Sequence, residues 1–204
     1  MQSSFRPTHL PSAANPPRNL RDLYQLKVLL LHVEPPIWRR LLVSNSIDLA
    51  MLHRIIQLVM GWSNKHSHQF TASGKEYGVP DDGFGNEISS EQGIRIGSLL
   101  KSVGQWIGYE YDFGDAWEHR ILLEKILPFK PGEAGPECID GRRSAPPEDV
   151  GGVWGYREFL EAFTDRGHAD HFETVAWVNK SFNPERFDIA DVNRQLKTMR
   201  NTSH

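Results

Sequence analysis

The sequence predicts an α+β fold with a mixed or antiparallel sheet, and three patterns indicate this class. Residues 104–127 contain two runs in which apolar and polar side chains alternate, as they do in half-buried strands joined into a hairpin. Residues 24–72 predict strand, strand, helix and strand in that order. Apolar residues then recur at helical spacing between residues 156 and 199. We therefore expect a sheet in the first part of the chain and helices at its C-terminal end.

Length and composition indicate one domain preceded by a tail. The chain has 204 residues, and residues 1–22 are rich in proline, serine and asparagine, which predicts a disordered tail. We expect one domain at 23–200, with a sheet-and-helix core at 23–127, an irregular Pro/Gly-rich loop at 128–155 and a helical part at 156–200. No apolar run has the roughly 18 residues of a membrane span, so no membrane partner is expected.

Charge and cysteine content narrow the class of protein. The net charge of −3 provides no global basic field for nucleic acid. The single cysteine, Cys138, excludes an internal disulfide and is typical of a reducing, cytoplasmic location. A cysteine nucleophile needs a neighbouring histidine that lowers its pKa, and the sequence places none near Cys138.

The first strands and the first helix have clear boundaries. Residues 24–33 and 37–43 predict two strands, which two prolines separate. Asp48 is a suitable N-cap for a helix over residues 49–60, and Gly61 is a suitable C-terminal stop.

The second strand and the hairpin carry a candidate partner surface. Trp38 and Arg40 fall on one face of the strand and Arg39 on the other. An aromatic ring beside arginines is typical of nucleic-acid contact by stacking and phosphate binding, whereas the alternative is a strand whose arginines pair with acids. Together with Tyr109 and Tyr111, these residues form the candidate surface for an unknown protein or nucleic-acid partner.

Residues 65–72 predict a strand on which His66 and His68 share one face. Two histidines two positions apart on a strand are able to reach one metal ion. The competing interpretation is a buried polar network that sets strand register.

The hairpin predicts a register, and the register predicts a cluster. If Gly114 and Asp115 form a two-residue turn, Phe113 pairs with Ala116. Directly opposed residues then share a face: Glu110, Asp112, Trp117 and His119 on one side, and Tyr109, Tyr111, Glu118 and Arg120 on the other. The first face is suited to binding a metal or polarising a water, and the alternative is a histidine held by a carboxylate at the edge of a core.

The irregular loop and the last helices complete the expectations. Two prolines, Glu148, Asp149 and two glycines predict a rigid loop packed against the hairpin, where the two acids add to the cluster. The candidate cluster thus comprises Glu110, Asp112, Asp115, Trp117, His119, Glu148 and Asp149. Helices are predicted at 156–163, 169–178 and 189–199, with Asp188 as the cap of the last and with Phe172, Val175, Ala176 and Trp177 of the second facing inward.

Several segments carry a resemblance to a known family. YDFGDAWEHRI resembles the signature of the plasmid pRiA4b ORF-3-like family, and EPPIWRRLLV, LHRIIQLVMGW, HSHQF, the PPEDVGG block and FNPERFDIADVNRQL match it in order, over about residues 23–196. The resemblance implies the fold and the site positions but no reaction, and some members accompany insertion elements under a resolvase-like label. The family often has further cysteines where this chain has Ala145 and Val150, which argues against a cysteine-ligated zinc site.

These observations leave three functions open. A binding or interaction module, with a link to mobile genetic elements, is slightly favoured because no complete catalytic motif is present. The alternative is a metal-dependent hydrolase that holds zinc or manganese through His66, His68, Asp112 and His119, with Glu110, Asp115 or Glu148 as base or support. The third is an accessory protein of DNA transactions, against which the acidic balance counts.

Overall fold

The computed structural model describes residues 22–80, 88–129, 135–178 and 182–201, so the predicted tail lies almost wholly outside the described residues. The strands are β1 Leu23–Leu30, β2 Trp38–Ser44, β3 His68–Ala72, β4 Lys75–Gly78, β5 Ser89–Ser90, β6 Trp106–Tyr111, β7 Trp117–Leu127 and β8 Glu137–Arg142. The helices are α1 Leu49–Met60, α2 Ile96–Leu99, α3 Gly152–Thr164, α4 His171–Trp177 and α5 Ile189–Asn201.

The strands form one sheet in the order β5-β4-β3-β6-β7-β1-β2-β8. Neighbours are antiparallel except β4 and β5, which are parallel, so the sheet is mixed. The predicted α+β class, the strand–strand–helix–strand opening and the central hairpin are confirmed. β8 lies within the segment that was expected to be an irregular loop.

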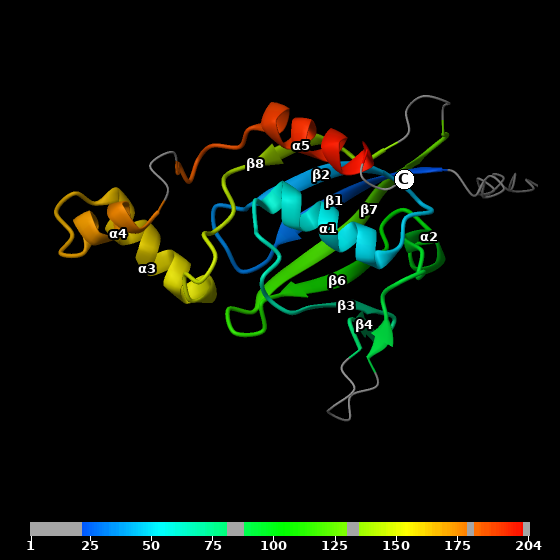
Figure 1. Ribbon diagram of the computed structural model, residues 1–204, viewed down its shortest axis with the longest axis horizontal. Helices are drawn as coiled ribbons and strands as arrows, with labels where there is room; N and C mark the ends of the chain where they lie inside the picture. The colour runs from blue at the N-terminus through cyan, green and yellow to red at the C-terminus, as the bar shows by residue number, and fades with distance from the viewer. Residues whose placement is uncertain (1–21, 81–87, 130–134, 179–181, 202–204) are drawn as a thin grey trace, which may run out of the picture.

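Helix α1 lies across one face of the sheet (Figure 1). Its predicted ends are confirmed: Asp48 accepts a hydrogen bond from the Met51 amide, and Gly61 ends the helix in the left-handed conformation with φ 80°. Its buried face also includes the polar side chains of His53 and Gln57. The covered face of the sheet therefore contains polar as well as apolar groups.

The predicted register of the β6–β7 hairpin is wrong by one residue. Tyr111 pairs with Trp117 and Tyr109 with His119, whereas Glu110 pairs with Glu118. In place of the predicted two-residue turn, the connection is a five-residue loop, 112–116, in which Asp112 (φ 59°) and Ala116 (φ 51°) have positive φ. A shift of one residue exchanges the faces of a strand pair. Tyr109, Tyr111, Trp117 and His119 accordingly share the buried face.

The C-terminal helices occupy two places (Figure 1). α5 lies along β8 and contacts α1, and Asp188 caps it as predicted by accepting from the Asp191 amide. Asn193 of α5 bonds to the edge strand β8, because its Nδ2 donates to the Cys138 carbonyl and its Oδ1 accepts from the Cys138 amide, both at 2.8 Å. α3 and α4 pack on each other and extend beyond the end of the sheet.

The expectation that α4 has an inward apolar face is wrong. Among the residues of α4, none is buried, and Phe172, Val175 and Trp177 are exposed. No helix in the described part of the chain is long and apolar enough to cross a membrane.

Candidate functional site

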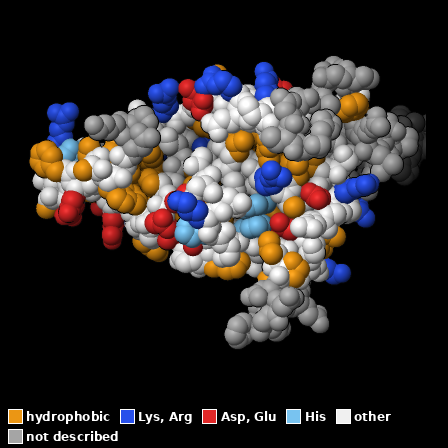
Figure 2. All heavy atoms as spheres, viewed as in Figure 1, with side chains coloured by type: hydrophobic (Ala, Val, Ile, Leu, Met, Phe, Trp, Pro, Cys, Tyr) orange, Lys and Arg blue, Asp and Glu red, His pale blue; other side chains and the backbone are white. Residues whose placement is uncertain are grey.

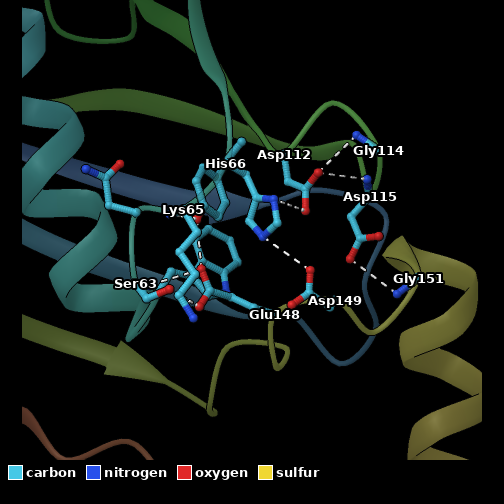
Figure 3. Close-up of polar contacts among 12 residues, drawn as sticks. Ser63, Lys65, His66, Asp112, Gly114, Asp115, Glu148, Asp149 and Gly151 are labelled. Carbon is cyan, nitrogen blue, oxygen red and sulfur yellow. Dashed lines mark hydrogen bonds and ion pairs between the residues drawn. The ribbon is translucent and has the colours of Figure 1, made fainter.

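Three loops meet at the end of the sheet where β6 turns into β7. Residues 61–67 connect α1 to β3, residues 112–116 connect β6 to β7, and residues 143–151 connect β8 to α3. Each loop supplies one side chain to a common point, and Figure 3 shows His66, Asp112 and Asp149 pointing toward one another. We call these three residues the His-Asp-Asp triplet.

The ligand atoms of the triplet are close enough to share an ion. His66 Nδ1 lies 3.4 Å from Asp112 Oδ2, and His66 Nε2 lies 3.2 Å from Asp149 Oδ1. One nitrogen and two carboxylate oxygens, one atom from each residue, lie within 4.8 Å of one another. The Nε2 contact lacks hydrogen-bond geometry, and this buried atom has no hydrogen-bond partner among the described residues. The triplet is the only group of three or more potential metal ligands within the described ranges.

Hydrogen bonds within the hairpin loop orient the Asp112 carboxylate. Its Oδ1 accepts from the amides of Gly114 (3.0 Å) and Asp115 (3.4 Å), so its Oδ2 is left to face His66. The Asp112 side chain is 13% exposed. Asp115 in turn accepts from the Gly151 amide at 3.2 Å, which ties the hairpin loop to the start of α3.

Glu148, in the loop between β8 and α3, is hydrogen-bonded to the loop that precedes β3 and to the last residue of β6. Its carboxylate accepts from the Ser63 amide (3.0 Å), the Ser63 hydroxyl (2.5 Å) and the Tyr111 hydroxyl (2.8 Å). Burial alone raises the pKa of this carboxyl, but the hydrogen bonds from Ser63 and Tyr111 outweigh burial and hold the pKa below its usual range. Because both oxygens are engaged, Glu148 supports the loops and Asp149 is the acid that faces His66.

A cleft of about 620 Å³ opens beside the triplet and shares His66 with it. The other lining residues are Ala50, His53, Arg54, Asn64, Ser67, His68, Val79, Ile88, Glu91 and Phe113. Figure 2 shows histidine side chains near the middle of this face of the molecule, with both Lys or Arg and Asp or Glu side chains beside them. This volume falls in the range of small-molecule sites.

A closed hydrogen-bond network fixes His53 in the floor of the cleft. Tyr109 accepts from Gln57 at 3.0 Å and therefore donates its own hydroxyl proton to His53 Nδ1 at 2.8 Å. His53 Nε2 then donates to the Asn64 side chain at 2.6 Å, and the Asn64 amide donates back to Gln57. Burial, followed by the neighbouring His68, lowers the pKa of His53 to about 4. His53 is thus a neutral imidazole with both nitrogens in use.

His68 lies flat against His53, with ring centroids 3.4 Å apart and planes inclined by 5°. Its Nε2 lies 2.8 Å from a carboxylate oxygen of Glu91, and both side chains are less than 10% exposed. His68 is therefore paired with Glu91 and does not belong to the triplet. His119 does not belong to the triplet either. Its side chain lies in the core, and its Nδ1 donates to the Trp117 carbonyl at 2.9 Å.

The other predicted site residues do not gather at this point. Glu110 lies on the opposite face of β6 and accepts from Gln69 at 3.0 Å. Trp117 is buried in the core. The expected cluster on one face of the hairpin is therefore not formed, and Asp112 alone of its four members reaches the triplet.

The predicted partner surface is not formed as a whole, because only Trp38 and Arg40 of its five residues are partly exposed. Tyr109 and Tyr111 are buried, and Arg39 is 1% exposed. Arg39 donates to the carbonyl of Val59 at the end of α1, and burial lowers its pKa to about 10. Arg40 is 25% exposed but pairs with acidic side chains, so the alternative that the arginines are engaged within the fold is the better description.

Comparison with known proteins identifies the family. The family model described as "Plasmid pRiA4b ORF-3-like protein" matches residues 22–191. The chain belongs to the plasmid pRiA4b ORF-3-like family. It is 40% identical over 161 residues to "Uncharacterized protein y4hQ" of Sinorhizobium fredii, a match that covers 78% of this chain and 82% of the relative.

A solved structure is similar to this member of the pRiA4b ORF-3-like family. It is the crystal structure of a "Protein of Unknown Function", MM3350, from Methanosarcina mazei Go1. The two chains are 37% identical with a TM-score of 0.78, and the match covers 85% of this chain and 98% of the other. The segments that predicted the family also build the site: HSHQF supplies His66, YDFGDAWEHRI supplies Asp112, and PPEDVGG supplies Asp149.

Sequence reasoning on this pRiA4b ORF-3-like protein missed part of the cleft. His53, Arg54 and Glu91 line the cleft, and none of them was singled out from the sequence. The local signal is a histidine and a glutamine one helical turn apart, His53 and Gln57, and it does not reveal which strand faces the helix. The cleft therefore depends on contacts between distant segments.

Proposed function

We propose that this protein binds a divalent metal ion through the His-Asp-Asp triplet and acts as a metal-dependent hydrolase. The observation that carries the proposal is the convergence of one imidazole and two carboxylates, from three separate loops, within 4.8 Å. Loops bring such groups together against charge repulsion between the two acids, and a cation offsets that repulsion.

The donor set suits zinc or manganese. An imidazole nitrogen with two carboxylate oxygens is a mixed, fairly hard set that both ions accept. Three protein ligands leave coordination positions for water and substrate, which is the pattern of catalytic sites. An ion bound in this way supplies Lewis acidity and lowers the pKa of water. The chain itself orients the carboxylates, through the loop amides on Asp112 and through Glu148 beside Asp149.

The test is the metal content and metal affinity of protein purified without a histidine tag. We expect about one equivalent of Mn²⁺ or Zn²⁺ per chain, and we expect His66→Ala and Asp112→Asn each to weaken binding by about 100-fold or more. His32→Ala is the matched control, because His32 is an exposed histidine that also contacts a carboxylate, Glu118, at 3.2 Å.

Two results contradict the metal site. One is wild-type protein that takes up no divalent ion at micromolar concentration. The other is binding that falls equally in His32→Ala and His66→Ala. If the metal binds, hydrolysis of model esters with and without the ion then tests the enzymatic part of the proposal.

A second candidate function, an interaction module, is favoured by the α3–α4 arm. α4 exposes Phe172, Val175 and Trp177, and Trp177 lines, with the buried Phe159, a hollow of about 700 Å³ between the two helices. Acidic side chains border this hollow: Asp149, Glu158, Glu161, Asp170 and Glu173. Large apolar groups exposed together mark binding surfaces, and the acidic border selects a partner segment with basic residues around an apolar anchor.

This candidate is tested with labelled peptides in which arginines or lysines flank a leucine or tryptophan. We expect binding that weakens with salt and falls at least about tenfold in Trp177→Ala and in the charge reversal Glu158→Lys. Glu76→Lys, on exposed β4, is the control for the loss of net negative charge. Peptides that bind both charge variants equally contradict the proposal.

The arginines of β2 do not support nucleic acid as the partner. Arg39 is buried, and Arg40 lies 2.7 Å from Glu124 and 2.9 Å from Asp140. These pairs neutralise the charge that a phosphate contact requires. A link to mobile genetic elements rests on the family resemblance alone.

A further inference from the structure

We infer that the cleft beside the triplet binds the oxyanion group, phosphate or carboxylate, of a small organic molecule, with Arg54 as the group that holds its charge and His68 as a hydrogen-bonding group beside it. This inference rests on the proposed function, because it places the substrate of that metal site. It assigns the cleft a ligand class that the metal proposal alone leaves open.

The first step is the charge of the cleft. Arg54 on α1 is exposed, lines the cleft and forms no ion pair with any described residue. Glu91 is the only acidic residue in the described lining, and it is already paired with His68. Within the described lining, the uncompensated charge is therefore the guanidinium of Arg54. A guanidinium presents two parallel donors that match the two oxygens of a carboxylate or phosphate.

The second step is the free nitrogen of His68. Glu91 holds Nε2, and the stacked ring of His53 holds the plane of the imidazole. Nδ1 of His68 makes no hydrogen bond with the part of the chain that the structure describes. His53 has no such free atom, because Tyr109 and Asn64 occupy both of its nitrogens. Because Nε2 donates to Glu91, Nδ1 of His68 is the atom of this stacked pair that is left to accept a hydrogen bond from a ligand hydroxyl or a water molecule.

The third step is the shape of the cleft around these groups. Val79, Ile88 and Phe113 line it, and Val79 and Phe113 are exposed. Exposed apolar side chains beside a polar floor suit a ligand with an apolar or ring-shaped body. His66 lines the cleft and belongs to the triplet, so an oxyanion in the cleft lies beside the proposed ion. Divalent ions with few protein ligands commonly take oxygens from such groups.

The experiment measures phenyl phosphate, benzoate, inorganic phosphate and phenol binding to the full-length protein by calorimetry, with and without MnCl₂. We expect both aromatic anions to bind and phenol to bind at least about tenfold more weakly. The tighter of phenyl phosphate and benzoate identifies the oxyanion. We expect Arg54→Gln to weaken anion binding at least about tenfold, while Arg95→Gln, at an exposed arginine outside the cleft, leaves it unchanged.

His68→Gln is expected to weaken binding as well, and because His68 is buried its folding is checked by thermal denaturation. Arg54→Gln keeps the inference falsifiable if His68→Gln does not fold, since Arg54 is exposed. Phenol that binds as tightly as phenyl phosphate, or anion binding unaffected by Arg54→Gln, overturns the inference.

The direct titration with MnCl₂ separates the two proposals. Manganese binding without any anion binding leaves the metal site intact and overturns the oxyanion inference. Arg54-dependent anion binding without manganese binding supports the oxyanion contacts and contradicts the metal site.

Discussion

His119 and His66 lie in neighbouring parts of the molecule, but their surroundings differ. His119 is buried beneath α1, donates to a backbone carbonyl and contacts the rings of Trp62 and Tyr109. His66 lies in a loop, is 27% exposed and faces two carboxylates. Burial lowers the pKa of His119 to about 4, so it is a neutral core residue at pH 7. The comparison teaches that the residue type does not assign the role, whereas the surrounding charges and burial do.

The largest expected difference between His119 and His66 is in how much each side chain contributes to stability. We expect His119→Ala to lower the free energy of unfolding by about 3 kcal/mol, because it leaves a cavity and an unpaired carbonyl in the core. We expect His66→Ala to cost less than about 1 kcal/mol, because its site is partly exposed and mainly electrostatic. Urea denaturation of both variants measures the difference, and equal losses contradict the division into a core and a site histidine.

The next effect is the pH dependence of stability. Burial holds the pKa of both His53 and His119 near 4, below the value of about 6.5 expected in the unfolded chain. The unfolded chain therefore binds more protons between these values, and the stabilisation, complete above pH 6.5, is lost as pH falls toward 4. Each histidine contributes a loss of up to about 1.4 kcal/mol per pH unit.

Urea denaturation at pH 7.0, 6.0 and 5.0 measures this slope. The variant His119→Gln carries no titrating ring, so its stability should fall less steeply than that of the wild type. If the two proteins lose stability in parallel over this range, His119 is not the neutral core residue described above.

The smallest effect concerns the hydroxyl that joins the core to the site. Tyr111 donates to Glu148 at 2.8 Å and accepts from the Lys65 amide at 3.2 Å. We expect Tyr111→Phe to lower stability by about 1 to 2 kcal/mol. Tyr77→Phe is the control, since the Tyr77 hydroxyl has no hydrogen-bond partner among the described residues and its loss should cost less than about 0.5 kcal/mol. Thermal denaturation distinguishes the two variants.

The sequence predicted the local elements of the fold better than the site. The ends of α1 follow from Asp48 and Gly61, whose preferences are local. The hairpin was correctly located, but its register depended on a loop in which Asp112 and Ala116, and not Gly114, have positive φ. Because of that single difference, Tyr109 and Tyr111 share the buried face with His119, whereas the predicted register put them on opposite faces.

The triplet shows the same limit. His66, Asp112 and Asp149 were each named from the sequence, but His66 was grouped with His68 and His119 because of their alternation along strands. In the structure, β3 begins at His68, so His66 lies in a loop and the alternation does not apply to it. The three loops are far apart in the sequence, so no local pattern indicates that they meet in the fold.

Asn193 has a consequence for how copies of this chain behave toward one another. A strand at the end of a sheet exposes backbone groups that readily recruit a strand from another molecule. The side-chain amide of Asn193 forms hydrogen bonds with the backbone carbonyl and the backbone N–H of Cys138 on β8, and α5 lies along the same strand. At the opposite end, β5 has only two residues. Both ends of the sheet thus offer a poor template for strand addition, which protects the protein from aggregation through its sheet.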